Sequence, residues 1–184
     1  IKTRFGVSSI AYQVDPGPEV SIKVSVNPDR IVKLNEEVRN LPASAHDKDA
    51  DNKVAFTKAT REWDLGDGQK VVDTVGVKMV ASVLTPLHTK GTGPSDGALK
   101  NIFTYLETQG ATGSHGYIKG HLLNDNLGGP GAAENLYPIT QQANSDHHSL
   151  IENEAKSLVN DQHFWVRYEV EVGNETVKNI PGPP

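Results

Sequence analysis

Strict alternation of apolar and polar residues near the carboxyl end constrains the fold more than any other feature. From Phe164 to Val172 every second residue is apolar, and the residues between are charged or amphipathic, as in Arg167 and Glu169. A period of two is typical of a half-buried β-strand. The segment Glu19–Val26 repeats the pattern with Val20, Ile22 and their successors. These segments predict a sheet with one face on a core.

The segments between these strands combine helical and extended patterns. Residues 98–107 carry one apolar stripe at helical spacing, and residues 143–160 carry a second, with Ile151, Ala155, Leu158 and Val159 directed inward. The Val-rich residues 71–84 predict a long strand or a bent pair, residues 54–63 fit helix or strand, and residues 29–41 suggest a helix that Pro42 ends. The fold class we expect is therefore α+β, with a larger mixed or antiparallel sheet and flanking helices.

Length and composition exclude several classes. The 184 residues suit one domain, and hydrophobic residues make up 36%. No apolar run approaches the ~20 residues of a membrane span. The absence of cysteine excludes disulfide scaffolds and thiolate chemistry, and the net charge of −5 argues against nucleic-acid binding by bulk positive charge. Because the chain opens on Ile1 without a leader, we expect a processed domain or fragment.

We expect a single domain over 1–184. It would comprise a strand-rich extension (1–65), a core (70–173) and a mobile tail (174–184).

Residues 117–152 carry the chemistry. A short strand ends in Lys119-Gly120-His121, a glycine-rich loop follows, and a helix begins near Asn144. Asn144, His148 and Glu152 are spaced four and four, which predicts one polar stripe along that helix. Amide and carboxylate oxygens suit Mg²⁺. The sequence therefore predicts a metal site, with His121 across from it as a base.

This stretch resembles the DNA/RNA non-specific endonucleases, a group of His-Me finger (ββα-metal) nucleases. The likeness rests on Lys119-Gly120-His121 in place of Arg-Gly-His, on residues 139–142, and on the eight-residue separation of Asn144 and Glu152. More narrowly, GHLLN, GGPG and ENLYPIT resemble nuclease domains at the C-termini of bacterial polymorphic toxins. The resemblance implies a ββα-metal finger inside the sheet and Mg²⁺, or Mn²⁺, as cofactor.

The resemblance also implies roles for individual residues. His121 would be the general base, Lys119 would bind phosphate, and Glu152 would orient the site. Asn144 would hold the metal, with Glu152 and His148 as further candidates. Alternatives remain open: Asn144 also fits a helix N-cap, Asn135 is a rival ligand, and His147 competes with His148. The residues expected to contact substrate are Lys119, His115 and Asn135.

The function we expect is metal-dependent, non-specific hydrolysis of phosphodiester bonds by a toxin domain of an antibacterial effector, with DNA as the substrate and RNA as the alternative. The resemblance implies secretion or delivery into a target cell, action in its cytoplasm, an inhibitory immunity protein as partner, and no membrane association. One alternative is a zinc-type metallohydrolase using His121 with His147 or His148, although no HExxH spacing exists. The other is a non-catalytic interaction or delivery module.

Overall fold

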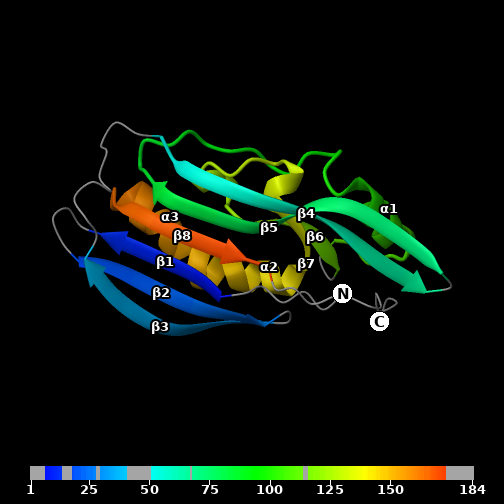
Figure 1. Ribbon diagram of the computed structural model, residues 1–184, viewed down its shortest axis with the longest axis horizontal. Helices are drawn as coiled ribbons and strands as arrows, with labels where there is room; N and C mark the ends of the chain where they lie inside the picture. Colours follow the sequence, from blue (N-terminus) through cyan, green and yellow to red (C-terminus); the bar gives the residue numbers. More distant parts are fainter. Residues whose placement is uncertain are drawn as a thin grey trace.

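The molecule is built on a six-stranded antiparallel sheet with the strand order β3-β2-β1-β8-β5-β4 (Figure 1). The computed structural model describes residues 7–13, 18–27, 30–40, 51–66, 68–113 and 116–172. The strands of the large sheet are β1 (Val7–Gln13), β2 (Pro18–Asn27), β3 (Arg30–Asn40), β4 (Lys53–Gly66), β5 (Gln69–Leu84) and β8 (Trp165–Glu171). The mixed α+β class predicted above is confirmed, and the large sheet is antiparallel.

Strand β8 lies inside the sheet, between β1 and β5. Its burial follows the predicted alternation, because Val166, Tyr168 and Val170 are buried whereas Arg167 and Glu171 are exposed. The inward residues lose nearly all contact with water, which is the largest favourable contribution to folding of such a strand. The predicted strand at residues 19–26 is likewise confirmed as β2.

Strands β4 and β5 form a long hairpin, which resolves the helix-or-strand ambiguity of residues 54–63 in favour of strand. Gly68 has φ of +74°, a conformation that glycine adopts at turns without steric cost. Residues 71–84 form one continuous strand with shifts of register against β4. Trp63 of β4 is buried in the hydrophobic core.

The helix predicted for residues 29–41 is wrong, because this segment is strand β3. It pairs with β2 from Pro18↔Asn40 to Asn27↔Arg30. Ile31, Val32 and Val38 are β-branched residues that suit a pleated surface, and the neighbouring strand supplies hydrogen bonds that local helical spacing does not reveal.

Helix α1 (Lys100–Thr108) confirms the helix predicted at residues 98–107. Ile102, Phe103 and Leu106 are its buried residues, as the apolar stripe indicates. The Ile102 amide donates to Asp73 Oδ2 at 2.7 Å, and Asn101 Nδ2 donates to the Val72 carbonyl at 2.9 Å. Two polar contacts therefore fix the start of α1 against β5.

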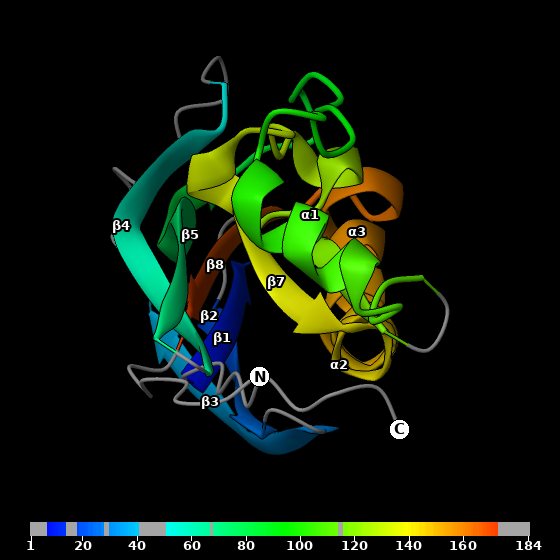
Figure 2. The same ribbon diagram turned by 90° about the vertical axis from the view of Figure 1, so that its right-hand side faces the viewer.

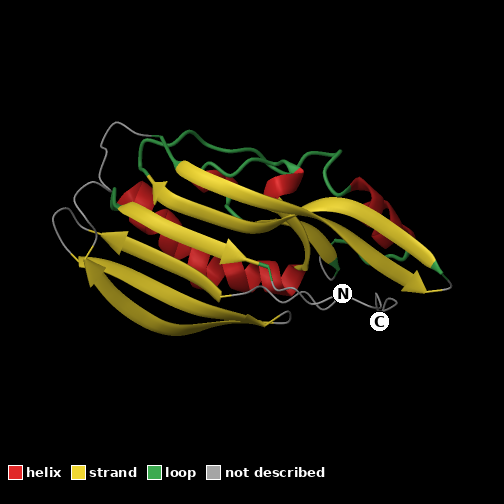
Figure 3. Cartoon of the chain, viewed as in Figure 1, coloured by secondary structure: helices red, strands yellow, loops and turns green. Residues whose placement is uncertain are grey.

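A second, two-stranded antiparallel sheet joins β6 (Tyr117–His121) to β7 (Leu136–Thr140). Helix α2 (Gln141–His147) follows β7 directly, and Thr140 Oγ1 accepts a hydrogen bond from the Ala143 amide at 3.1 Å as its N-cap. Figures 2 and 3 show α1, α2 and the β6–β7 hairpin on one side of the large sheet. The hairpin and the helix after it thus form a compact ββα unit on one face of the sheet.

The helical run continues from Gln141 to Asp161. It passes through the π-helical turn η4 (His148–Glu152), α3 (Asn153–Lys156) and a second π-helical turn η5 (Ser157–Asp161), with right-handed helical dihedrals at the junctions. This confirms the helix predicted at residues 143–160, including its four inward apolar residues. None of the helices in the described ranges combines the length and apolar character required to cross a membrane. The tail at 174–184 lies outside the described residues.

Candidate active site

Lys119 and His121 project from β6 toward the loop at residues 92–96. Being two residues apart on one strand, they share a face of it. The Lys119 ammonium donates to the carbonyls of Ser95 and Asp96, at 3.0 and 3.3 Å. His121 Nε2 lies 3.1 Å from the carbonyl oxygen of Thr92. The loop therefore holds both side chains from the side away from β7.

The partner of His121 determines its tautomer. A backbone carbonyl oxygen can only accept, so Nε2 of His121 carries the hydrogen. In the neutral imidazole the lone pair then lies on Nδ1. His121 is partly exposed and ends its strand, so the unprotonated nitrogen belongs to a side chain that solvent reaches. This is the arrangement that a general base requires.

Two glycine-containing loops pack together to position Thr92. The Thr92 amide donates to Gly129 O at 3.1 Å, and Thr92 Oγ1 accepts from the Gly131 amide at 2.8 Å. Added Cβ atoms would collide with backbone carbonyls, of Leu123 at position 129 and of Gly93 at position 131. Glycine at these positions thus permits the close approach that places the Thr92 carbonyl against His121.

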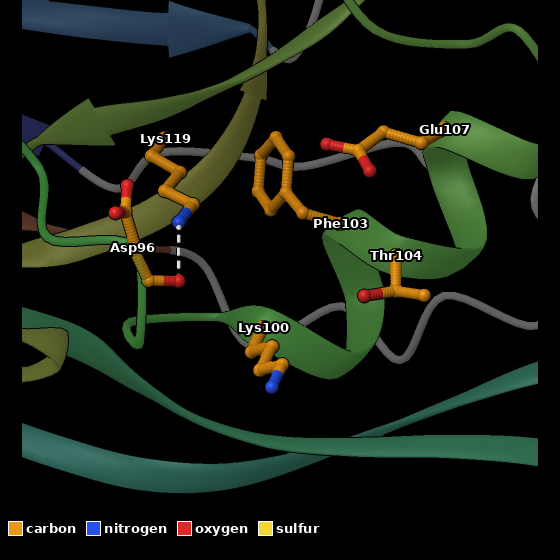
Figure 4. Close-up of a pocket in the computed structure, with 6 residues that line it drawn as sticks. All are labelled: Asp96, Lys100, Phe103, Thr104, Glu107 and Lys119. Atoms are coloured by element: carbon orange, nitrogen blue, oxygen red, sulfur yellow. Dashed lines mark hydrogen bonds between the residues drawn. The ribbon is translucent and has the colours of Figure 1, made fainter.

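The Lys119 side chain also lies over an aromatic ring. Its Nζ is 5.6 Å from the centroid of Phe103, a cation–π distance. An open pocket of about 280 Å³ lies beside it between α1 and β6 (Figure 4). The residues that line it are Asp96, Lys100, Phe103, Thr104, Glu107 and Lys119. Two backbone carbonyls and the face of one aromatic ring therefore already contact the Lys119 ammonium group.

Asn144 lies on α2 beside β6. Its Oδ1 is 3.6 Å from the position that a Cβ on Gly120 would occupy, so the carboxamide is adjacent to the residue that precedes His121. Because α2 begins at Gln141 with Thr140 as its cap, the N-cap alternative for Asn144 is wrong. No hydrogen bond to its carboxamide occurs among the residues that the structure describes, and the side chain is partly exposed. The carboxamide oxygen is thus available as a ligand.

Glu152 is 5% exposed, which excludes the alternative of a solvated helix side chain. In an α-helix, residues eight apart lie roughly 80° apart around the axis. A π turn contains one more residue than an α turn. Across η4 the angle between Asn144 and Glu152 around the helix axis therefore falls to roughly 20°. The π turn therefore rotates Glu152 toward the line of Asn144, which regular helical spacing would not achieve.

Three side chains contact the Glu152 carboxylate. Asn124 Nδ2 donates to Oε2 at 3.0 Å, and His148 Nδ1 lies 3.3 Å from the same oxygen. His147 Nδ1 lies 3.5 Å from Oε1. Asn124 follows β6 closely, so this bond connects the loop after His121 to the helix that carries Asn144. A buried carboxylate needs such partners to offset its lost hydration.

The two adjacent histidines differ sharply in burial. His148 has a side chain that is 49% exposed and a further contact with Lys156, at 3.3 Å. His147 is buried, and its Nε2 lies 2.7 Å from the Tyr168 hydroxyl. Burial lowers the pKa of His147, and the Glu152 carboxylate opposes this effect only in part. His147 is therefore a neutral imidazole at neutral pH, and both histidines lie against Glu152.

Asn135 is fully buried and all of its carboxamide hydrogen bonds are internal. Its Oδ1 accepts from the Leu123 amide at 2.8 Å, and its Nδ2 donates to the carbonyls of Leu123 and Pro130, both at 2.9 Å. This geometry braces the loop after β6 and does not fit the contact with substrate, or the metal-ligand role, considered for Asn135. His115, the other expected substrate contact, lies outside the described residues.

The groups around β6 and α2 that could hold a metal include the oxygens of Asn144 and Glu152 and the ring nitrogens of three histidines. Among the described residues, no group of three or more His, Cys, Asp and Glu side chains is arranged to hold a metal ion. The carboxamide of Asn144 and the carboxylate of Glu152 supply hard oxygen atoms from one helical run, and Mg²⁺ commonly takes one or two protein oxygens and keeps several waters. The site therefore fits a weakly chelated hard cation better than a multi-histidine zinc centre.

A family model described as DNA/RNA non-specific endonuclease matches residues 83–181, just over half of the 184 residues. The chain belongs to this family. The matched region of the endonuclease begins at the end of β5 and includes β6, β7, α2 and β8, so it contains every residue of the site described above. Membership implies a nucleic-acid substrate and a divalent cation. No curated protein and no solved structure matches the chain.

Sequence reasoning about the endonuclease missed Asn124 and Thr92. Asn124 Oδ1 accepts from the Asn126 amide at 2.9 Å and caps the short helix η2 (Asp125–Leu127). The run Asn124-Asp125-Asn126 is a recognisable cap or turn signal. The bond from Asn124 to Glu152, however, joins residues 28 positions apart, and the contact of His121 with Thr92 spans 29. No local pattern reports contacts over such distances.

Proposed function

We propose that this chain is a Mg²⁺-dependent endonuclease that hydrolyses phosphodiester bonds of DNA, and also of RNA, with little sequence preference. The observation that carries the proposal is the placement of His121: its Nε2–H is committed to the Thr92 carbonyl, and Asn144 lies against the neighbouring Gly120. A base and a hard oxygen ligand therefore meet on adjacent elements. Family membership supports the reaction class.

We infer further that β6, β7 and α2 act as a ββα-metal finger. Asn144 Oδ1 would hold the cation directly, and Glu152 would contribute from its buried position on η4. When bound, the cation supplies positive charge to the phosphate and to the leaving oxygen. Mn²⁺ is expected to substitute, since it accepts the same ligands.

His121 would act through its Nδ1. This nitrogen accepts a proton from the water that attacks the phosphorus, and the imidazolium that forms keeps its Nε2–H bond to the Thr92 carbonyl. Lys119 would leave the carbonyls of Ser95 and Asp96 to contact a phosphate. Because ammonium is a point charge, that contact would be less directional than an arginine fork.

Plasmid digestion tests the proposal. Wild type should cut with Mg²⁺ and stop on addition of EDTA, and His121→Ala should lose at least about 10²-fold in rate, the scale of losing a general base. His163→Asn is the matched control, because His163 is exposed and its φ of 59° is one that asparagine tolerates. Cleavage that persists in EDTA, or in His121→Ala, would contradict the proposal.

The alternatives give distinct results. A zinc-type metallohydrolase would be active with Zn²⁺ and inactive with Mg²⁺, but the described residues offer no cluster of three ligands for it. A non-catalytic delivery module would retain its function in His121→Ala. Membership in an endonuclease family favours neither.

We also propose that the chain is the toxin domain of a secreted or delivered effector that acts in the target cytoplasm, with an inhibitory immunity protein as partner. The support is the likeness of residues 120–140 to polymorphic toxin domains. Expression in a bacterial cytoplasm should arrest growth for wild type and spare it for His121→Ala. Equal growth of both strains, with equal protein levels, would contradict the toxin role.

A further inference from the structure

A chain of buried polar side chains connects the centre of the large sheet to Glu152. Tyr168 lies on β8, in the middle of the sheet, and is fully buried. Its hydroxyl lies 2.7 Å from Nε2 of His147, and the two rings are stacked with centroids 6.4 Å apart. The other ring nitrogen of His147 faces the Glu152 carboxylate at 3.5 Å. Tyr168 of β8, His147 of α2 and Glu152 of η4 thus lie in contact one after the other.

The chemistry of the partners fixes the direction of this chain. A carboxylate oxygen can only accept, so the tautomer with hydrogen on Nδ1 suits the 3.5 Å contact between His147 and Glu152. In the neutral ring Nε2 is then an acceptor, and Tyr168 is the donor at the far end. Each group has one role, so rotation of the imidazole would break both contacts.

The second carboxylate oxygen is held from the opposite direction. Asn124 Nδ2 reaches Oε2 at 3.0 Å from the loop after β6, and Glu152 as a whole is nearly excluded from solvent. Oε1 faces a histidine on α2 and Oε2 faces an amide beside the β6 hairpin. The plane of the carboxylate is therefore set by both halves of the ββα unit.

We propose that His147, aligned by Tyr168, is a positioning residue that fixes the Glu152 carboxylate for the cation site, in the manner of an outer partner of a metal ligand. The inference rests on the proposed metal-dependent nuclease function. It assigns a role to the buried histidine, whereas the exposed His148 contacts the same carboxylate only from the solvent side.

Three variants separate positioning from packing. His147→Leu fills the space and removes both the hydrogen bond to Tyr168 and the polar contact with Glu152. His147→Asn keeps an amide N–H that can donate to Glu152 from the position of Nδ1. Tyr168→Phe removes only the hydroxyl. Thr85→Val is the control for loss of a buried hydroxyl elsewhere. Thr85 is fully buried, and its hydroxyl makes no hydrogen bond to Tyr168, His147 or Glu152.

Two readouts apply to each purified full-length variant: the calorimetric affinity for Mn²⁺ without nucleic acid, and the split of cleavage into kcat and KM. His147→Leu should weaken Mn²⁺ binding and lower kcat by about 10-fold to 100-fold, with KM for DNA unchanged. His147→Asn should restore most of both, and Tyr168→Phe should fall between. Thr85→Val should lower the melting temperature without changing either readout.

Several results would overturn the inference. They are wild-type Mn²⁺ affinity in His147→Leu, equal defects in the Leu and Asn variants, or an effect confined to KM. Failure of the proposed function has a different signature, because His121→Ala and Asn144→Ala would then also cleave at the wild-type rate. If those two variants are inactive while His147→Leu keeps wild-type kcat and Mn²⁺ affinity, only the positioning role is refuted.

Discussion

Gly120 lies on β6 between Ile139 of β7 and Asn144 of α2. A Cβ at this position would overlap the side chain of Ile139 and stand 3.6 Å from Asn144 Oδ1. We therefore expect Gly120→Ala to lower the free energy of unfolding by about 1–3 kcal/mol through overpacking against Ile139, and to reduce cleavage because relief of this clash displaces β6 and with it His121. Urea denaturation and plasmid cleavage measure the two effects.

Gly97→Ala provides the comparison for this substitution. Nothing lies within 4 Å of a Cβ at Gly97, so its free energy of unfolding should change by no more than about 0.5 kcal/mol. Equal behaviour of the two variants would show that the side chain of Ile139 on β7 does not constrain position 120.

Tyr168 makes stability depend on pH at the alkaline end. Burial raises its pKa well above the ordinary value of 10.0, and the Glu152 charge acts in the same direction. Below pH 10 both states hold the phenolic proton and the contribution is constant. Above pH 10 the unfolded chain loses that proton first, so the free energy of unfolding should fall by up to about 1.4 kcal/mol per pH unit.

Urea titrations of wild type and Tyr168→Phe between neutral pH and pH 11 check this expectation. Above pH 10 the free energy of unfolding of Tyr168→Phe should fall less steeply with pH than that of wild type. The difference in slope should correspond to at most one proton released on unfolding. Parallel curves for the two proteins would mean that Tyr168 ionises as easily in the folded state as in the unfolded chain.

For single residues, the sequence identifies the candidates for the site but not the residues that hold them in place. His121, Asn144 and Glu152 could be found because each lies in one strand or one helix at a recognisable spacing. Which asparagine remains available could not be predicted, since the bonds of Asn135 to Leu123 and Pro130 depend on how the loop closes. Glu152 ends a π turn, and the sequence carries no signal that distinguishes this turn from a regular α turn.

The two glycine loops form the element that orients His121. Residues 89–97 and 128–131 share three hydrogen bonds along their contact, including the one from the Ser95 amide to the Gly131 carbonyl at 2.8 Å. We expect Gly131→Ala to separate the loops, because its Cβ would meet the Gly93 carbonyl. The Thr92 carbonyl would then leave His121, and kcat should fall by about 10-fold or more.

Gly93→Ala is the matched partner, since a Cβ there meets nothing within 4 Å although the residue belongs to the same contact. Its cleavage rate should equal wild type. Steady-state kinetics on a short duplex, with melting curves to confirm folding, separate the two. A wild-type kcat in folded Gly131→Ala would contradict the role of these loops.

Helices and strands in which apolar residues recur at a regular spacing could be predicted from the sequence. Those whose conformation depends on pairing with another strand could not. Strand β8 and helix α1 follow from their apolar spacing alone. Strand β3 was mistaken for a helix because Ile31, Leu34 and Val38 also fit helical spacing, and only pairing with β2 decides between the two. Strand β7 contains Pro138, which weakens the strand signal, yet it pairs with β6 along its whole length.

At the level of the whole molecule, the amino-terminal strands belong to the same sheet as the matched endonuclease region. Strand β1 pairs with β8 from Ser9↔Glu169 to Gln13↔Trp165. Deletion of residues 1–40 would leave one edge of β8 unpaired, and exposed edges promote association. We therefore expect the truncated chain to melt at a lower temperature and to elute as oligomers in size-exclusion chromatography.

Retention of a monomer with the wild-type melting temperature would contradict this expectation. It would show that residues 1–40 are an accessory to a core that is stable without them. Cleavage assays on the same sample report whether the site survives the loss of β1–β3.

The position of β8 has a consequence for biosynthesis. It is the last strand of the described chain, yet it lies between β1 and β5, so the amino-terminal three-stranded unit and the β4–β5 hairpin have no common neighbour until it arrives. A nascent chain on the ribosome therefore holds two unconnected half-sheets until residue 171 has emerged from the exit tunnel. The cleavage machinery would assemble only after synthesis of nearly the whole described chain, which delays the appearance of a nuclease inside the cell that makes it.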